Sequence, residues 1–222
     1  MPDIAAIQRD ADERRLIRKI QKAVGFVAPK SVELPESLFS APGVLVDLAT
    51  LGFLPIGIVA TDGWTFGRET EDEEIEGLGY ASAVRTDIVK VTRTVTVTTL
   101  ETGRKHMQEL ILGMDLTGVT MDKDTGEIVF DEPDLPINEE MRLLVVGSDG
   151  PADALWVLGN GFGAATLTSS GDEVWGKEGA VQRELSFKIA PDDETGSPTK
   201  RYVGGSGALA AKEALGFELS TP

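Results

Sequence analysis

The chain has no cysteine, a single histidine (His106) and no long apolar run. The lack of cysteine excludes disulfides and thiolate metal sites, and one histidine is too few for histidine-based zinc sites. No apolar stretch approaches the roughly 20 residues that cross a bilayer. Residues 1–15 carry charges where a signal peptide needs an apolar segment, so we expect the chain to stay where it is made.

Positive charge is also scarce. The 222 residues contain 37 acids against 21 Lys and Arg, which gives a net charge of −16. Such a surface repels nucleic acid phosphates and anionic membranes, so we expect neither membrane association nor specific DNA binding. A hydrophobic fraction of 41% is typical of a soluble globular protein with a real core.

Residues 3–24 show a helical pattern of apolar side chains, and Gly25 is a plausible stop. This segment is basic, with five cations in nine residues: Arg14, Arg15, Arg18, Lys19 and Lys22. A cationic amphipathic helix can touch a membrane or nucleic acid, but here we expect it to dock on an acidic neighbour. Residues 25–55 show no sustained apolar period and contain prolines. This pattern predicts an extended arm that lies over the surface or on a neighbour; the alternative is a solvated linker. We therefore divide the chain into residues 1–50, a helix and arm, and residues 51–222, one β domain.

The β domain is predicted from alternation. An apolar strand, an Asp62-Gly63 turn and a returning strand predict a hairpin. In the long strand that follows, Val89, Val91, Val95 and Val97 fall on one face. The other, wet face carries Lys90, Thr92, Thr94, Thr96 and Thr98.

One internal helix follows, with Thr102 as the expected cap and Gly113 as its end. Residues 118–133 predict a hairpin with a polar tip, and three further strands cover "MRLLVVGS", "ALWVLGN" and "AVQRELSFKI". In the last of these, alternation places Val181, Leu185, Phe187 and Ile189 on one side. "LAAKEALGF" predicts a short terminal helix. The fold class is mainly β: a β-sandwich or barrel with one packed internal helix, an N-terminal helix and an extended arm.

Carboxylates are the only abundant catalytic side chains. Six lie within eight positions: Glu69, Glu71, Asp72, Glu73, Glu74 and Glu76. On a strand at most three of these acids share one face. Two interpretations of the stretch therefore remain open: a divalent cation site and a solvated acidic segment. A carboxylate hydrolase would need two acids that converge across a cleft, whereas the acids here cluster along single strands and loops.

Other motifs are weaker. Asp122, Asp124 and Gly126 match part of a calcium loop but lack its distal Glu, and a turn explains them better. "GNGFGAAT" does not have dinucleotide-binding spacing, and the Gly-rich stretch before the last helix lacks the residues of a phosphate loop. A carbohydrate-binding module would expose an aromatic platform, whereas Trp64, Trp156 and Trp175 are flanked by strand-like residues and fit a core as well.

Several segments together resemble the major tail tube proteins of long-tailed (siphovirus-type) phages of actinobacteria. They are "TDGWTFGRETEDEEIEG", "VRTDIVKVTRTVTVTTLET", the helix "RKHMQELILG" and, more loosely, "RELSFKIAPDDETG" with "ALAAKEALGF". The resemblance covers residues 50–113 and 180–217, and the order of elements carries it. The basic segment over residues 3–24 is outside the family pattern.

The resemblance implies a structural virion protein rather than an enzyme, made in the bacterial host cytoplasm and without a cofactor. It implies hexameric rings that stack into a tube around the tape measure protein, with tail terminator and tail-tip proteins as further partners. Double-stranded DNA would pass through the bore without specific binding. We expect the stretch from Glu69 to Glu76 to face this lumen or the next ring. The alternative is another virion β-sandwich, such as a tail terminator or minor tail protein.

Overall fold

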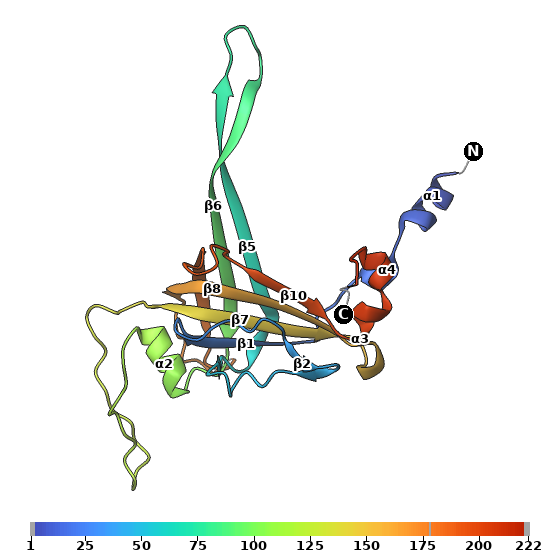
Figure 1. The fold of residues 1–222 in the computed structure, drawn as a ribbon. Coiled ribbons are helices and arrows are strands. Elements are labelled where there is room, and N and C mark those ends of the chain that lie inside the picture. Colours follow the sequence, from blue (N-terminus) through green and yellow to red (C-terminus); the bar gives the residue numbers. More distant parts are fainter. Residues whose placement is uncertain (1–2, 178, 220–222) are drawn as a thin grey trace.

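The computed structural model describes residues 3–177 and 179–219, which form one antiparallel eight-stranded sheet with a few short helices (Figure 1). The strand order is β4-β1-β7-β8-β9-β6-β5, and β10 also pairs with β8. The strands are β1 (Lys22–Pro29), β4 (Leu54–Pro55), β5 (Val59–Glu76), β6 (Ala83–Thr99), β7 (Glu140–Asp149), β8 (Trp156–Ser170), β9 (Arg183–Ala190) and β10 (Lys200–Gly204). A small hairpin joins β2 (Phe39–Ala41) to β3 (Val44–Leu45).

The helices are short. They are α1 (Ile4–Ala11), α2 (Lys105–Leu112), α3 (Ser206–Ala210) and α4 (Lys212–Leu215), with 3-10 turns η1 (Arg14–Leu16) and η2 (Ala152–Ala154). The mainly β fold class predicted from the sequence, with one packed internal helix, is thus confirmed. None of the described helices is long and apolar enough to cross a bilayer.

The sheet curls until its two ends meet. β4 pairs with β1 at one end of the strand order, and β5, which begins only four residues after β4, pairs with β6 at the other. Between them, the Ile56 amide donates to the Gly25 carbonyl at 2.8 Å, and the Leu100 amide donates to the Ile58 carbonyl at 2.9 Å. The segment from β4 to β5 therefore bridges the ends and gives the sheet a barrel-like closure.

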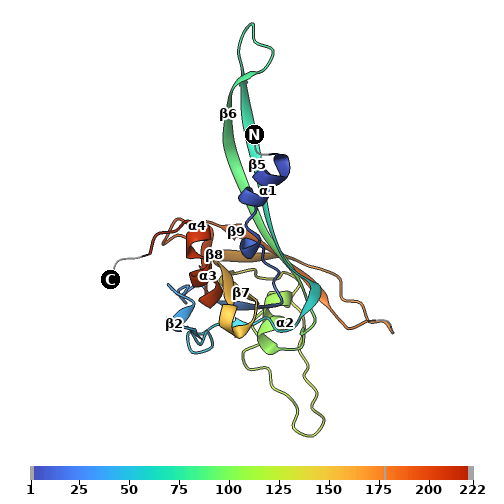
Figure 2. The ribbon, with the colours of Figure 1, turned by 90° about the vertical axis from the view of Figure 1, so that its right-hand side faces the viewer.

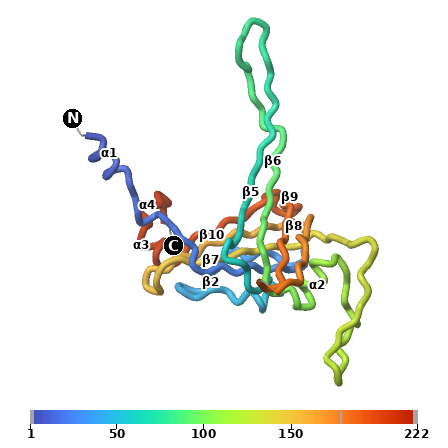
Figure 3. The backbone as a smooth tube through the Cα atoms, turned by 180° about the vertical axis from the view of Figure 1, so that it is seen from behind, coloured from blue at the N-terminus to red at the C-terminus, as the bar shows by residue number. Residues whose placement is uncertain are grey.

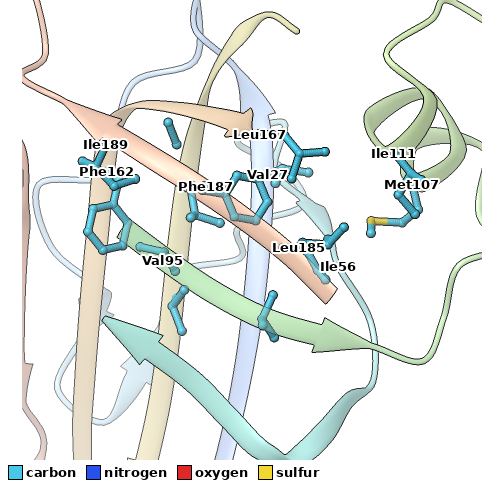
Figure 4. Packing of buried hydrophobic residues seen from close by; sticks show 14 residues of the cluster. Val27, Ile56, Val95, Met107, Ile111, Phe162, Leu167, Leu185, Phe187 and Ile189 are labelled. Atoms are coloured by element: carbon cyan, nitrogen blue, oxygen red, sulfur yellow. The ribbon is translucent and has the colours of Figure 1, made fainter. Parts of the chain in front are cut away.

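The principal core lies inside this curl (Figure 4). Alternation along β6 buries Val95 and Val97, and alternation along β9 buries Leu185, Phe187 and Ile189. α2 packs on the same cluster through Met107 and Ile111. The predicted faces of these two strands are confirmed at these positions, whereas Val181 precedes β9 and is exposed.

A second core lies on the outer face of the sheet. β7 is buried on both faces, so that Leu143 contributes to the principal core and Leu144 to the second. The covering segment follows β1 and includes the β2–β3 hairpin. It buries Leu38, Leu48 and Phe53 against this face. The region predicted as an extended arm therefore covers the sheet of its own chain.

The predicted N-terminal helix over residues 3–24 is wrong beyond Ala11. α1 ends there, η1 follows, and residues 22–29 form β1, hydrogen-bonded to β4 and β7. Apolar residues that fit a helical period also fit a strand once two neighbours are available to pair. The division of the chain at residue 50 stays a prediction, and pairing places β1 in the same sheet as the later strands.

Two further local predictions are wrong. Asp62-Gly63 is not a hairpin turn, because β5 runs through it with a register irregularity between Val59 and Trp64. Thr102 does not cap α2: the N-cap is Arg104, and the Thr102 carbonyl accepts from the Gln108 side chain at 2.7 Å. The predicted end at Gly113 is confirmed, since this residue adopts a left-handed conformation with φ 60°.

Residues 118–133 were expected to form a hairpin, but they contain no strand and belong to a long loop over residues 113–139. A turn does form at its tip. Asp122 Oδ1 accepts from the Asp124 and Thr125 amides at 2.9 and 2.8 Å, and the Gly126 amide donates to the Asp122 carbonyl. The turn interpretation of this motif is therefore confirmed. Hydrogen bonds from Thr125 and Asp124 lower the pKa of Asp122 below its usual 3.8.

Candidate assembly interface

The most prominent feature of the molecule is a two-stranded arm that leaves the body (Figures 1 and 2). β6 pairs with β9 only over residues 93–99, so residues 83–92 pair with β5 alone. We call residues 69–92 the arm. The core side of β5 ends near Phe66, whose ring stacks on Phe162 at 6.0 Å between centroids. Beyond that point the strands have no core to cover.

The acidic stretch occupies one strand of the arm. All six acids are exposed residues of β5, and the strand's alternation divides them between its two faces. Asp72, Glu74 and Glu76 continue the side of Trp64 and Phe66. Glu69, Glu71 and Glu73 lie on the opposite side. Three acids a face is the division expected for an extended chain, and within the described residues no group of three His, Cys, Asp or Glu side chains is arranged to hold a metal ion.

Charges within the arm are only partly compensated. Lys90 lies directly opposite Glu71 and pairs with it at 2.5 Å, and Arg85 pairs with Asp87 on its own strand at 2.7 Å. Glu73 lies opposite Asp87, where two like charges destabilise a strand pair. The arm contains seven acids and two bases, a net charge of −5. A neighbouring cationic surface would relieve this repulsion.

The arm also exposes apolar side chains and backbone edges. Its exposed large hydrophobic residues are Ile75, Leu78, Tyr80, Val84, Ile88 and Val89. Among the strands described, β5 pairs only with β6 along its whole length. Unpaired edges and exposed apolar groups on a soluble protein are typical of surfaces that meet a partner.

The predicted wet face lies opposite the buried Val95 and Val97. Lys90 and Thr94 are exposed, and Thr92, Thr96 and Thr98 are half-buried. Val89 and Val91 were predicted on the apolar face. Val91 is half-buried, but Val89 is exposed, because it lies at a register irregularity in a part of β6 that has no core beneath it. Which surroundings this face meets in an assembly stays a prediction.

The five N-terminal cations do not lie on a helix. Arg14 and Arg15 are in η1, Arg18 and Lys19 follow it in extended chain, and Lys22 begins β1. Arg18 contacts its own chain: its guanidinium lies 4.1 Å from the centroid of the Trp156 ring, and its Nη1 lies 3.5 Å from Asp149 Oδ2.

The remaining basic residues of this segment face outward. Arg15 bonds to Glu13 on the surface, and the side chains of Lys19 and Lys22 are exposed. α1 has no buried residue and leaves Ile4 and Ile7 exposed. Docking of this region on an acidic neighbour stays a prediction.

The loop over residues 113–139 projects from the end of the body opposite to the arm (Figures 1 and 3). It contains eight acids and one lysine, a net charge of −7. It also exposes Met121, Ile128, Val129, Leu135 and Ile137. The arm and this loop are therefore both acidic, and contact between the two in neighbouring copies would be opposed by their charges.

Sequence reasoning missed a groove of about 1050 Å³ at the root of the arm. It lies between the first residues of β5 and residues of β1, β7, β8 and β10. Glycines in the strands were the available signal, since a glycine within a strand often marks a close approach. At Gly147, which lines the groove, an added Cβ would lie 2.9 Å from the Ile20 side chain.

The aromatic residues do not form a binding platform. Trp156 is buried, Trp64 is half-buried at the closure of the sheet, and Trp175 is exposed beyond β8. The core interpretation thus holds for Trp156 and is wrong for Trp175. The Trp175 indole donates a hydrogen bond to Glu173. This hydrogen bond and a second one from Arg183 lower the pKa of Glu173.

Comparisons with known proteins give distant structural likenesses. The tube-terminating cap of the anti-feeding prophage aligns over 87% of this chain and 97% of its own, at 10% identity and a TM-score of 0.42. A chain of the PVC extracellular contractile injection system sheath–tube complex aligns over 92% of this chain and 99% of its own, at 8% identity and a TM-score of 0.42. Because both TM-scores are below 0.5, neither likeness establishes a function for this chain. No protein-family profile and no curated protein matches the sequence.

Proposed function

We propose that this chain is a structural virion protein, the subunit of hexameric rings that stack into a phage tail tube. The observation that carries the proposal is the arm. It is a hydrogen-bonded ribbon with exposed apolar residues and unpaired edges, attached to a barrel-like body that has its own core. In a monomer the edges and apolar groups of this element stay exposed to water, whereas a neighbour that pairs with it would cover both.

The arrangement of the projections also suits a stacked assembly. The arm and the loop over residues 113–139 extend from opposite ends of the body (Figure 1). Head-to-tail contacts that close form rings, and head-to-tail contacts that do not close form filaments, so a tube needs both kinds. Opposite projections let each ring contact the ring before it and the ring after it through different surfaces.

The charge of the chain fits a conduit for DNA. Six copies at −16 each give −96 for a ring before counterions bind. A lining of Lys and Arg would hold the duplex through phosphate contacts, whereas an acidic lining lets it pass. In this proposal the acids of the arm face the lumen or the adjoining ring, and the tape measure protein occupies the bore before DNA does.

Electron microscopy of the purified protein in negative stain, at low and high salt, tests the proposal. We expect hollow tubes of uniform width. Isolated rings at every salt concentration would instead indicate a tail terminator. Monomers that stay monomeric with tape measure and tail-tip partners present would contradict the proposal.

A further inference from the structure

The groove at the root of the arm is lined by apolar side chains, two cations and two acids. Val24, Ile58, Phe66 and Val203 line it and are exposed, although each is a large apolar side chain. The groove thus leaves several large apolar side chains in contact with water. Exposed apolar surface of this kind marks a site for a partner.

The groove is less acidic than the chain as a whole. Lys22 and Arg201 line it and are exposed, and Lys200 adjoins Arg201 on β10. Asp62 and Glu101 line it as well, but Glu101 is paired with Arg104 at 2.5 Å. In a chain of net charge −16, this groove is a place where an acidic ligand would be accepted.

We propose that the groove of one copy receives the arm of a second copy, an inference that rests on the proposed self-assembly. The arm complements the groove, because it carries exposed apolar side chains, a net charge of −5 and a pair of hydrogen-bonded strands. Leu78 and Tyr80 at its tip are among the most exposed apolar residues of the chain. Apolar groups enter the groove, while the acids of the arm meet Lys22 and Arg201.

Strand pairing favours the arm over the other acidic projection. β5 and β10 both contribute residues to the groove, and in the described structure each pairs along one edge only. An incoming ribbon can add to such an edge and satisfy its backbone groups. The loop over residues 113–139 contains no strand, so it offers charge and apolar side chains without this complementarity.

A chain cannot fill its own groove with its own arm. Trp64 and Phe66 line the groove, and they lie on β5 just before the arm begins. The ten residues from Gly67 to Glu76 extend about 33 Å at about 3.3 Å per residue. Folding this ribbon back on its root would break its strand pairing, so the occupant is a second copy.

Disulfide trapping between two single-cysteine proteins tests the contact, and the natural chain contributes no background because it has no cysteine. One protein carries Leu78→Cys on the arm and the other, of distinguishable mass, carries Val203→Cys in the groove. We expect mild oxidation to yield heterodimers about tenfold in excess of a control mixture, because bound sulfurs must approach within disulfide geometry. The control replaces Val203→Cys with Leu135→Cys on the loop.

Charge reversal gives a second measurement. Lys22→Glu with Arg201→Glu in the groove, or Glu74→Lys with Glu76→Lys on one face of the arm, should each weaken association about tenfold or more. All four substitutions in one chain should restore it, because opposite charges again face each other. Melting temperatures of the dissociated variants show that each one folds.

The outcomes separate this inference from the proposed function. Tubes without preferential trapping of Leu78→Cys by Val203→Cys, or without rescue by the fourfold variant, would overturn the inference and leave the tube proposal standing. Trapping of Val203→Cys by Ile7→Cys in its place would assign the groove to α1 and also overturn it. Preferential trapping and rescue in a protein that forms no ring or tube would establish the contact while the tube proposal fails.

Discussion

Arg142 and Asp192 form a buried ion pair, with 2.7 Å between Arg142 Nη1 and Asp192 Oδ1 and side chains only 2% and 6% exposed. The same guanidinium donates to the carbonyls of Gly163 at 2.7 Å, Lys30 at 3.1 Å and Val32 at 3.0 Å. One side chain of β7 thereby holds together the segment after β1, strand β8 and the loop between β9 and β10. This contact stabilises the body independently of any assembly.

We predict that Arg142→Met lowers the free energy of unfolding by about 3 kcal/mol, because it leaves Asp192 buried without its cation. Adding Asp192→Asn should recover part of the loss, since no uncompensated charge then remains. Urea denaturation measures both. Arg15→Met, which removes an exposed pair with Glu13, is the control and should leave stability unchanged. A double variant no more stable than Arg142→Met would contradict the prediction.

The pH dependence of the free energy of unfolding should reflect the Arg142–Asp192 ion pair. Burial acts to raise the pKa of Asp192, but the hydrogen bond and charge of Arg142 outweigh it and lower the pKa below its usual 3.8. Because the folded-state pKa is the lower one, the carboxylate stabilises the protein above the unfolded-state pKa. That stabilisation is lost as the pH falls through the folded-state pKa.

The stability difference between the natural chain and Asp192→Asn should therefore be constant from about pH 7 to about pH 5 and shrink below about pH 4. Urea denaturation at a series of pH values measures this difference. A gap that widens on acidification would show that the pair does not lower the pKa of Asp192.

Gly25→Ala should destabilise the closure of the sheet. A Cβ at this position of β1 would collide with the Trp64 ring on β5, so the ring must move away from the core that it covers. Overpacking of this kind costs about 1–3 kcal/mol. Thermal denaturation with tryptophan fluorescence measures the loss and the displacement. Gly103→Ala is the control, because its Cβ would meet no atom within 4 Å; equal losses in both variants would refute the explanation.

Neutralising acids on the arm should reduce assembly without changing the stability of the dissociated chain. The variant combines Glu71→Gln, Asp72→Asn, Glu73→Gln and Glu74→Gln, all at exposed positions. Tube yield by electron microscopy and DNA ejection from virions are the measurements.

A matched control removes four acids from the loop over residues 113–139. It combines Glu127→Gln, Asp131→Asn, Glu132→Gln and Asp134→Asn, also at exposed positions. The change of net charge is the same, so a difference between the two variants reports the location of the acids. Unchanged assembly and unchanged ejection in the arm variant would remove the hypothesis that its acids face the lumen or the next ring.

Salt should favour tube formation. Copies of net charge −16 repel one another, and at 0.1 M ionic strength this repulsion is screened over about 10 Å. Contacts made at closer range and partly buried, such as those proposed between arm and groove, are screened less. Sedimentation of the purified chain across a salt series should show the polymer fraction rising; a fraction that falls steadily would mean that direct ion pairs dominate over net repulsion.

Local sequence determined much of the sheet. Alternation placed Val95, Val97, Leu185, Phe187 and Ile189 in the core, because a strand with one buried face must carry apolar residues at every second position. Gly113 marked the end of α2, because glycine adopts the left-handed backbone there without the strain that a side chain adds. The division of the arm's acids into two sets of three also follows from the period of an extended chain alone.

The tertiary structure decided the rest. Residues 22–24 form a strand and not the end of a helix because β4 and β7 are there to pair with β1, and that pairing joins segments far apart in the chain. β6 continues as a strand beyond its contact with β9, yet Val95 is buried and Val89 exposed. β9 supports only residues 93–99, and a register irregularity at Val89 interrupts the alternation of β6. The groove, the arm and the Arg142–Asp192 pair likewise depend on which strands meet. Periodicity sets which face a side chain occupies, and only long-range pairing sets what that face contacts.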